Sequence, residues 1–202
     1  MSLESERGGP ERLLKDPLAI RALAHPARLD LLALIGRAGQ ATTAEAAREL
    51  GISHGLASHH LRQLAKYGFV EQVAGKDQRE RPWRAAAAGV RWPDQHDSPE
   101  AAAATGVLEQ VLAERVLDGF LSWQQRRAGW PAAWLDGAGL GTATLYLTAA
   151  ELSEMTAAFG AMVARYEDRR ATADAGPRPD GALPVDVSFI AVPGPVPPPA
   201  EA

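Results

Sequence analysis

The chain has 202 residues and is 46% hydrophobic, so it can bury the core of one fair-sized domain or two small ones. It contains no cysteine, which excludes disulfides, thiolate metal sites and thiol redox chemistry. The sequence shows neither an apolar run of membrane-spanning length nor a signal-peptide core, and we therefore expect a soluble cytoplasmic protein.

The formal net charge of −4 is unevenly distributed along the chain. Residues 15–90 contain 11 Lys and Arg against 7 Asp and Glu, whereas residues 91–202 contain 8 against 15. A basic segment joined to an acidic one is typical of a nucleic-acid-binding domain with a separate sensing or assembly part.

The N-terminal region is predicted to be a flexible arm, residues 1–14, followed by two helices. The first helix ends before His25-Pro26, because a residue that precedes proline avoids the α region. Pro26 then suits the first turn of a second helix, which extends to about residue 35 and ends at Gly36 and Gly39.

Residues 43–64 predict two short helices joined by a tight turn. Thr42 or Thr43 caps the first helix, Gly51 tolerates the positive φ at its end, and Ser53 caps the second. The second helix has a stripe of buried spacing formed by Ala57, His60, Leu61 and Leu64. About 200° away lies a small, polar face that suits insertion into the DNA major groove, formed by Gly55, Ser58, His59 and Arg62.

A β-hairpin is predicted next, with strands at 69–73 and 81–85. Its tip carries Lys76, Arg79 and Arg81, which suit contacts with DNA phosphates or the minor groove. The alternative is an ordinary solvated hairpin tip. The preceding helix pair favours a wing beside a DNA-recognition helix.

Residues 17–90 resemble the winged helix-turn-helix domain of ArsR-type bacterial transcriptional regulators. The resemblance covers about a third of the chain and is carried by the motifs LAHPARL at 23–29, EAA at 45–47, LGIS at 50–53, SHHL at 58–61 and GFV at 68–70. It implies a symmetric homodimer that binds double-stranded operator DNA and is often regulated by a metal or another effector. With the face and wing described above, it implies DNA contacts by Ser53, His54, Gly55, Ser58, His59, Arg62, Lys76, Arg79 and Arg81.

A metal site is not expected, although a metal-responsive regulator is an open alternative. Asp94 and His96 resemble half of the site of zinc-sensing relatives, but the other half would fall near Val107 and Gln110, which are not suitable ligands. We expect no metal and no cofactor.

Residues 91–98 are predicted to be a linker, followed by a long helix from residue 99 to about 127. This helix has apolar side chains on two sides, which predicts packing against its own domain and against a second subunit. A helix buried wholly within its own chain is the alternative. We assign the dimer interface to Val107, Leu108, Val111, Leu112, Phe120 and Leu121.

The region 99–193 is completed by a predicted strand–helix–strand unit, with strands at 143–148 and 185–192 around a helix that extends to about residue 169. A two-stranded sheet is poorly stable alone, so the unit should pack on the long helix or join a partner's sheet. Its aromatic residues either fill a core or form a pocket for an unidentified small-molecule effector; these residues are Trp123, Trp130, Trp134, Tyr146 and Phe159. The proline-rich tail, 194–202, is predicted to be disordered.

The expected fold class is therefore α+β and mostly helical. The expected function is a dimeric, sequence-specific DNA-binding transcriptional regulator, most simply a repressor. The alternative is a winged-helix protein-interaction module without specific DNA binding. No catalytic motif is present in the sequence, and an enzyme is not expected.

Overall fold

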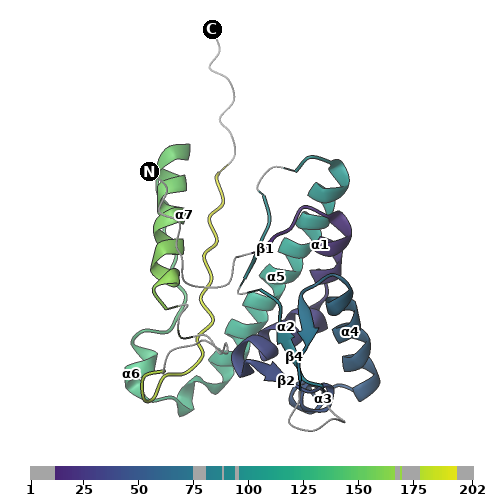
Figure 1. The fold of residues 1–202 in the computed structure, drawn as a ribbon. Helices are drawn as coiled ribbons and strands as arrows, with labels where there is room; N and C mark the ends of the chain where they lie inside the picture. Colours follow the sequence, from purple (N-terminus) through teal and green to yellow (C-terminus); the bar gives the residue numbers. More distant parts are fainter. Residues whose placement is uncertain are drawn as a thin grey trace.

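The computed structural model describes residues 12–74, 81–87, 89–93, 96–166, 169 and 178–194. Most of the described chain is helical, and small strands lie among the N-terminal helices (Figure 1). No helix in this part of the chain is long and apolar enough to cross a membrane. The tail beyond residue 194 and most of the predicted arm lie outside the described residues.

The first two helices begin at short-range capping signals. Helix α1, Pro17–Leu23, is capped by the Asp16 side chain, which accepts the Leu18 N–H at 2.9 Å. Helix α2, Pro26–Ala38, is capped in the same way by His25 and ends at Gly39, whose φ is +81°. Both helices start with proline, whose missing N–H would have no partner in a first helical turn.

Helices α3, Thr43–Leu50, and α4, His54–Lys66, form the predicted helix-turn-helix. The predicted hairpin follows as β3, Val70–Gln72, and β4, Trp83–Ala85, paired antiparallel. A third strand, β2 at Gln40–Ala41, pairs with β4 on the other side and gives the sheet order β2-β4-β3. Sequence reasoning did not predict β2.

A second, parallel pair joins β1, Arg12–Leu13, to β5, Val90–Arg91. The neighbouring Leu14 is 2% exposed. Residues 12–14 were expected in the flexible arm, but the structure shows them paired and packed on the domain. Local sequence patterns do not predict this pairing, because it connects residues almost 80 positions apart in the chain.

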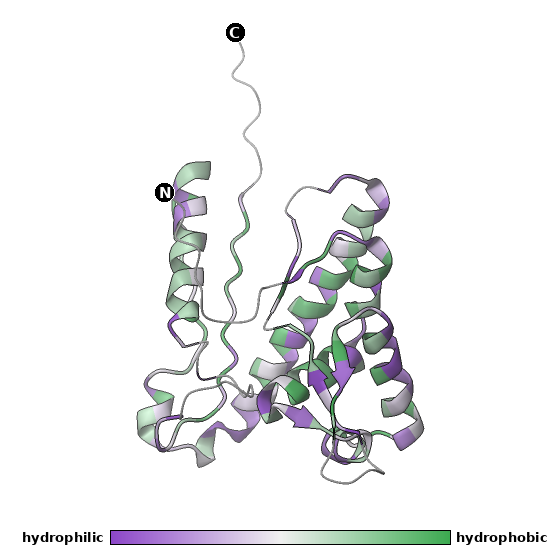
Figure 2. Cartoon of the chain, viewed as in Figure 1, coloured by the Kyte–Doolittle hydropathy of each residue, from purple (hydrophilic) through white to green (hydrophobic). Residues whose placement is uncertain are grey.

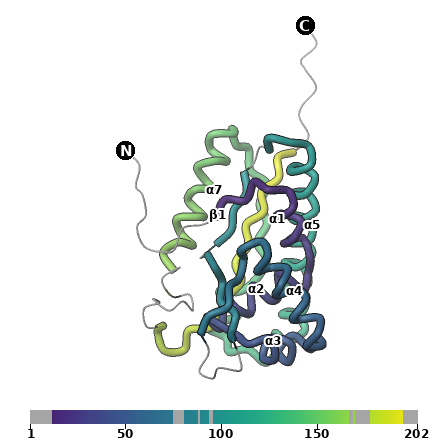
Figure 3. The backbone as a smooth tube through the Cα atoms, turned by 45° about the vertical axis from the view of Figure 1, so that its right-hand side comes forward, coloured from purple at the N-terminus to yellow at the C-terminus, as the bar shows by residue number. Residues whose placement is uncertain are grey.

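The core is confined to the N-terminal half of the chain. Its largest fully buried side chains are Leu14, Ile20, Leu31, Ile35, Leu61, Leu64 and Leu108. Helix α5, Pro99–Arg126, contributes through its first turns, which pack along α1, and both views show these helices side by side (Figures 1 and 3). This confirms the predicted long helix.

Beyond α5 the chain continues through the 3-10 helix η1, Arg127–Gly129, the short helix α6, Ala132–Leu135, and helix α7, Ala149–Ala164. The strands predicted at 143–148 and 185–192 are not formed in the single chain. A strand needs a hydrogen-bonding neighbour, and no described segment lies in register with either one. The mostly helical α+β class is confirmed, whereas the predicted sheet of the C-terminal unit is absent from the single chain.

Candidate nucleic-acid interface

Helix α3 is capped at both ends. The Oγ1 of Thr42 accepts the Glu45 N–H at 3.2 Å, and Glu45 Oε2 accepts the Thr42 N–H at 2.8 Å. The Thr42 N–H, together with the Thr42 hydroxyl that donates to the same Glu45 oxygen at 2.9 Å, lowers the pKa of the Glu45 carboxyl. Gly51 then takes a left-handed conformation with φ of +63°, and the Ile52 N–H returns to the Ala47 carbonyl at 3.0 Å. The predicted caps of both ends of α3 are confirmed.

Helix α4 begins at Ser53, whose Oγ accepts the Leu56 N–H at 3.2 Å, as predicted. Its predicted inner stripe is buried in full, from Ala57 to Leu64. On the opposite side Ser53, His54, Gly55, His59 and Arg62 are exposed, and Ser58 is half-buried. One helix therefore presents a small, polar surface to solvent while its other side is fixed in the core.

The guanidinium of Arg62 is partly held by its own helix. Its Nε donates to the Ser58 carbonyl at 3.1 Å, and this bond leaves both terminal Nη groups free to donate elsewhere. Lys66, one turn further along, is also exposed on the same side of the helix. Lys66 was not predicted from the sequence, although it lies four residues after Arg62, and this helical spacing places both on the same side of α4.

Three histidines lie together: His59 and His60 belong to α4, and His25 is the N-cap of α2. The rings of His25 and His60 are 4.5 Å apart between centroids, and those of His59 and His60 are 5.3 Å apart. Burial is the main cause that lowers the pKa of both His25 and His60, and the nearby Arg28 lowers both further. His60 is 6% exposed and lies on the inner face, as predicted, so it supports α4 instead of facing DNA.

The wing is fastened to the helix pair at its base. The Trp83 Nε1 donates to Thr43 Oγ1 at 3.0 Å, and Arg84 in β4 pairs with Glu71 in β3 at 2.7 Å. Arg81 is exposed two residues before the return strand β4. Lys76 and Arg79, predicted at the wing tip, lie outside the described residues.

Helix α5 is tied to the winged domain by polar contacts. Arg115 Nε lies 3.0 Å from Asp30 Oδ1 of α2, and Trp92 Nε1 donates to Glu109 Oε1 at 3.1 Å.

The side chains assigned to a dimer interface on α5 divide into three groups. Val107 and Leu121 are exposed, whereas Val111, Leu112 and Phe120 are half-buried. Leu108 was also predicted at this interface, but it is 1% exposed and packs in the core of its own chain. It therefore presents no surface to a partner.

The five aromatic residues assigned to an effector pocket are not gathered around one cavity. The rings of Trp130 and Trp134 meet edge to face at 6.1 Å, and Phe159 stacks on Phe189 at 5.0 Å. Tyr146 is fully exposed, and Trp123 lies beside Phe120 of its own helix. Among the described residues these rings therefore form separate contacts, and the effector pocket stays a prediction.

The metal alternative finds little support in the described residues. They contain no group of three or more His, Cys, Asp or Glu side chains placed to hold a metal ion. His96 is half-buried, and Asp94 lies outside the described residues.

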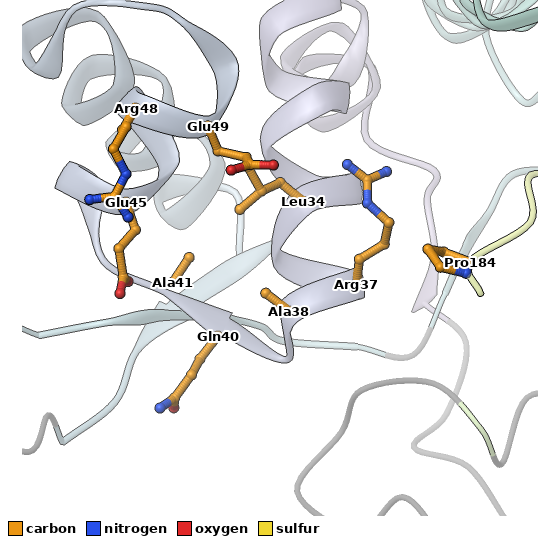
Figure 4. Close-up of a pocket in the computed structure, with 9 residues that line it drawn as sticks. All are labelled: Leu34, Arg37, Ala38, Gln40, Ala41, Glu45, Arg48, Glu49 and Pro184. Carbon is orange, nitrogen blue, oxygen red and sulfur yellow. The ribbon is translucent and has the colours of Figure 1, made fainter. Parts of the chain in front are cut away.

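A shallow depression of about 420 Å³ lies where the C-terminal segment passes the winged domain (Figure 4). It is bordered by the end of α2, by β2 and α3, and by Pro184. Its charged side chains are of both signs, Arg37 and Arg48 with Glu45 and Glu49, so it favours neither an anion nor a cation. Arg178 donates to the Arg37 carbonyl at 3.5 Å nearby, which makes this a contact between the two halves of the chain.

Comparison with known proteins identifies the N-terminal domain. Residues 23–73 match the family described as "Helix-turn-helix domain". No curated protein sequence matches the chain.

Several solved structures are similar to part of this chain. Reduced HlyU from Vibrio cholerae is 20% identical, with 46% of this chain and 84% of that chain covered and a TM-score of 0.31. A homodimeric winged helix-turn-helix DNA-binding domain from Mycobacterium bovis, described as a possible ArsR-family regulator, is 25% identical, with coverages of 48% and 76% and a TM-score of 0.32. A mutant of MarR from E. coli in complex with operator DNA is 18% identical, with coverages of 74% and 85% and a TM-score of 0.31.

Residues 23–73 thus match a helix-turn-helix domain, and the structure adds beside it the antiparallel β3–β4 hairpin of a wing.

Proposed function

We propose that this protein is a homodimeric, sequence-specific transcriptional repressor that acts in the bacterial cytoplasm and binds an inverted-repeat operator. In this proposal residues 15–90 bind DNA and residues 99–193 assemble the dimer. The observation that carries it is the two-sided character of α4: its inner stripe is buried, and its outer face is exposed, small, polar and cationic.

The dimensions and chemistry of this face suit the major groove. Gly55 adds no side-chain bulk, so the backbone at the start of α4 can approach the base edges closely. His59 and Ser58 offer hydrogen-bonding groups, and Arg62 offers the fork that matches the O6 and N7 atoms of guanine. Lys66, at the far end of the helix, lies where a phosphate contact is expected.

The wing supplies the second contact. Arg81 and the predicted tip residues Lys76 and Arg79 are proposed to bind the phosphates beside the major groove. A direct side-chain hydrogen bond from Trp83 to Thr43 anchors the wing to α3, the helix that precedes α4.

Two copies are needed for an inverted repeat, because each half-site is read by one recognition helix. We propose that the exposed side of α5, including Val107 and Leu121, contributes to the contact between the copies. The effector, if the regulator uses one, is proposed to bind in the C-terminal half, which is acidic and separate from the DNA-binding face.

The test is binding to DNA from around its own gene, measured by fluorescence anisotropy at several salt concentrations with random DNA as competitor. We expect the specific site to bind about 10³–10⁷ times more tightly than random sequence. Binding that depends on salt alone, without preference for any sequence, would refute the proposal and favour a winged-helix protein-interaction module.

A further inference from the structure

The C-terminal half of the chain has no core of its own. Every residue classed as buried in the structure lies between Leu14 and Leu108, and none of the described residues from 109 onward is buried. Thirteen large hydrophobic side chains from Trp130 to Val192 are nevertheless at least 36% exposed. Figure 2 shows how apolar α7 and the neighbouring C-terminal segment are. Exposed apolar side chains in this number indicate a surface that a partner molecule covers.

The segment 185–192, VDVSFIAV, is the clearest case. It is rich in β-branched residues, and Val185, Val187, Ile190 and Val192 are each 59–81% exposed. Its backbone groups form no hydrogen bond with another described residue. Unpaired strand-like backbone next to apolar side chains is a template for pairing with another strand.

Helix α7 does not supply the missing core. Its Phe159 ring stacks on Phe189 at 5.0 Å with an interplanar angle of 25°, so the segment lies against one side of the helix. The helix has no buried residue, and it packs extensively on no other helix or strand of the described chain. Met162 on the helix and Tyr166 just after it remain about half exposed. A helix with one extended segment beside it is only part of the packed layers that enclose a hydrophobic core.

We propose that a second copy of this chain completes this unit: residues 185–192 and 143–148 of both copies form one intermolecular sheet, and the two α7 helices cover it. This inference rests on the homodimer of the proposed function and adds the surface and the strand pairing that hold it. Two copies supply four β-prone segments, whereas one copy supplies two, and three or more strands are needed for an independently stable sheet. A two-fold axis brings the same segments together from both copies.

The size and charge of the surface favour a protein copy over other occupants. Thirteen exposed apolar side chains exceed what one ligand pocket holds, and a stable interface, to which each partner contributes roughly 800 Å², has room for them. Residues 91–202 have 15 acidic and 8 basic side chains, which opposes binding to an anionic membrane surface. The exposed Leu117 and Leu121 extend the apolar surface along α5, the helix proposed to join the two copies.

Hydrogen exchange of the full chain, read by mass spectrometry at several protein concentrations, tests this directly. The single chain leaves the amides of 143–148 and 185–192 open to exchange, whereas the intermolecular sheet would slow their exchange about tenfold or more. Sedimentation of the same samples gives the oligomeric state. We expect a dimer with both segments protected, and we expect the protection to fall on dilution together with the dimer.

Proline substitutions test whether the backbone of residues 185–192 pairs as a strand. Val187→Pro and Ser188→Pro each remove one backbone donor, and the two N–H groups point to opposite edges of a strand. At least one of them should lower dimer affinity by about tenfold or more, whereas the control Val187→Ile keeps the donor and should not.

The outcomes separate this inference from the proposed function. A dimer with unprotected 185–192, or protection of that segment in a monomer, overturns the intermolecular sheet and leaves the DNA-binding proposal intact. A protected dimer that binds no DNA sequence preferentially supports the sheet and overturns the regulator. A monomer at tens of micromolar chain overturns both the sheet and the homodimer.

Discussion

Replacing Arg62 with alanine tests the DNA-facing side of α4 most directly. Within the described part of the chain only Nε of Arg62 is engaged, by the Ser58 carbonyl at 3.1 Å, so both Nη groups can reach a guanine while the helix bond holds the side chain in place. A bidentate contact of this kind contributes about 1–3 kcal/mol. We therefore expect Arg62→Ala to raise the Kd for the operator roughly 5- to 150-fold and to relax the preference at one base pair of each half-site.

The chain offers a closely matched control. Arg126 near the end of α5 has the same local geometry, because its Nε donates to the Ser122 carbonyl four residues earlier at 3.2 Å. Arg126→Ala removes the same charge and the same type of helix bond, but away from the proposed DNA face. Its operator affinity should stay within about twofold of the parent protein, since one charge at a distance is largely screened.

Fluorescence anisotropy with operator and random duplexes, repeated across a salt series, separates base contacts from phosphate contacts. Arg62→Ala should weaken operator binding more than random binding. Lys66→Ala, in contrast, should weaken both similarly and reduce the slope of log K against log salt by about one unit. If Arg62→Ala and Arg126→Ala changed both affinities equally, α4 would not be the reading helix, and the assignment of the interface would be wrong.

Three further predictions concern the stability of the winged domain. Thr42→Ala should lower the free energy of unfolding by about 0.5–2 kcal/mol in urea denaturation followed by circular dichroism, whereas Thr42→Ser, which keeps the capping hydroxyl, should cost much less. Leu61→Ala should cost about 2–5 kcal/mol in the same assay because Leu61 is fully buried, and a cost as small as that of the exposed Leu56→Ala would contradict its place in the core. The lowered pKa values of His25 and His60 mean that the unfolded chain binds protons more readily below the ordinary pKa of 6.5, so stability should fall as the pH drops through that value. Denaturation at a series of pH values should show a shallower dependence for His60→Gln, and an unchanged dependence would show that His60 is not responsible.

The parts of the interface that sequence analysis predicted correctly depend on neighbours only a few residues apart. Ser53 and Gly51 act within one helical turn, and the buried stripe of α4 follows from a period of 3.6 residues. Lys66 was overlooked within the same period, because the predicted face was counted only as far as Arg62. The outward face of α4 could therefore be derived in full from local spacing.

Contacts between distant residues were not predictable in this way. Strands β1 and β2 have two residues each, and they form only because β5 and β4 present open edges to them. The burial of Leu108 has the same origin: its position on α5 was correctly apolar, but which neighbour covered it depended on how α1 packed. Periodicity identifies an apolar face, whereas the tertiary structure decides what covers it.

Two capping boxes in this chain show where local information ends. Thr42 with Glu45 and Thr148 with Glu151 form the same pair of bonds, at 3.2 and 2.8 Å in the first box and 3.3 and 2.7 Å in the second. Both start a helix where the sequence predicts one, yet α3 buries alanines beneath it and α7 buries nothing. Since equal local signals give equal helix starts, the difference in burial comes from the surface that each helix meets. Helix α3 finds that surface within its own chain, and α7, with the unpaired strand segments beside it, requires a second one.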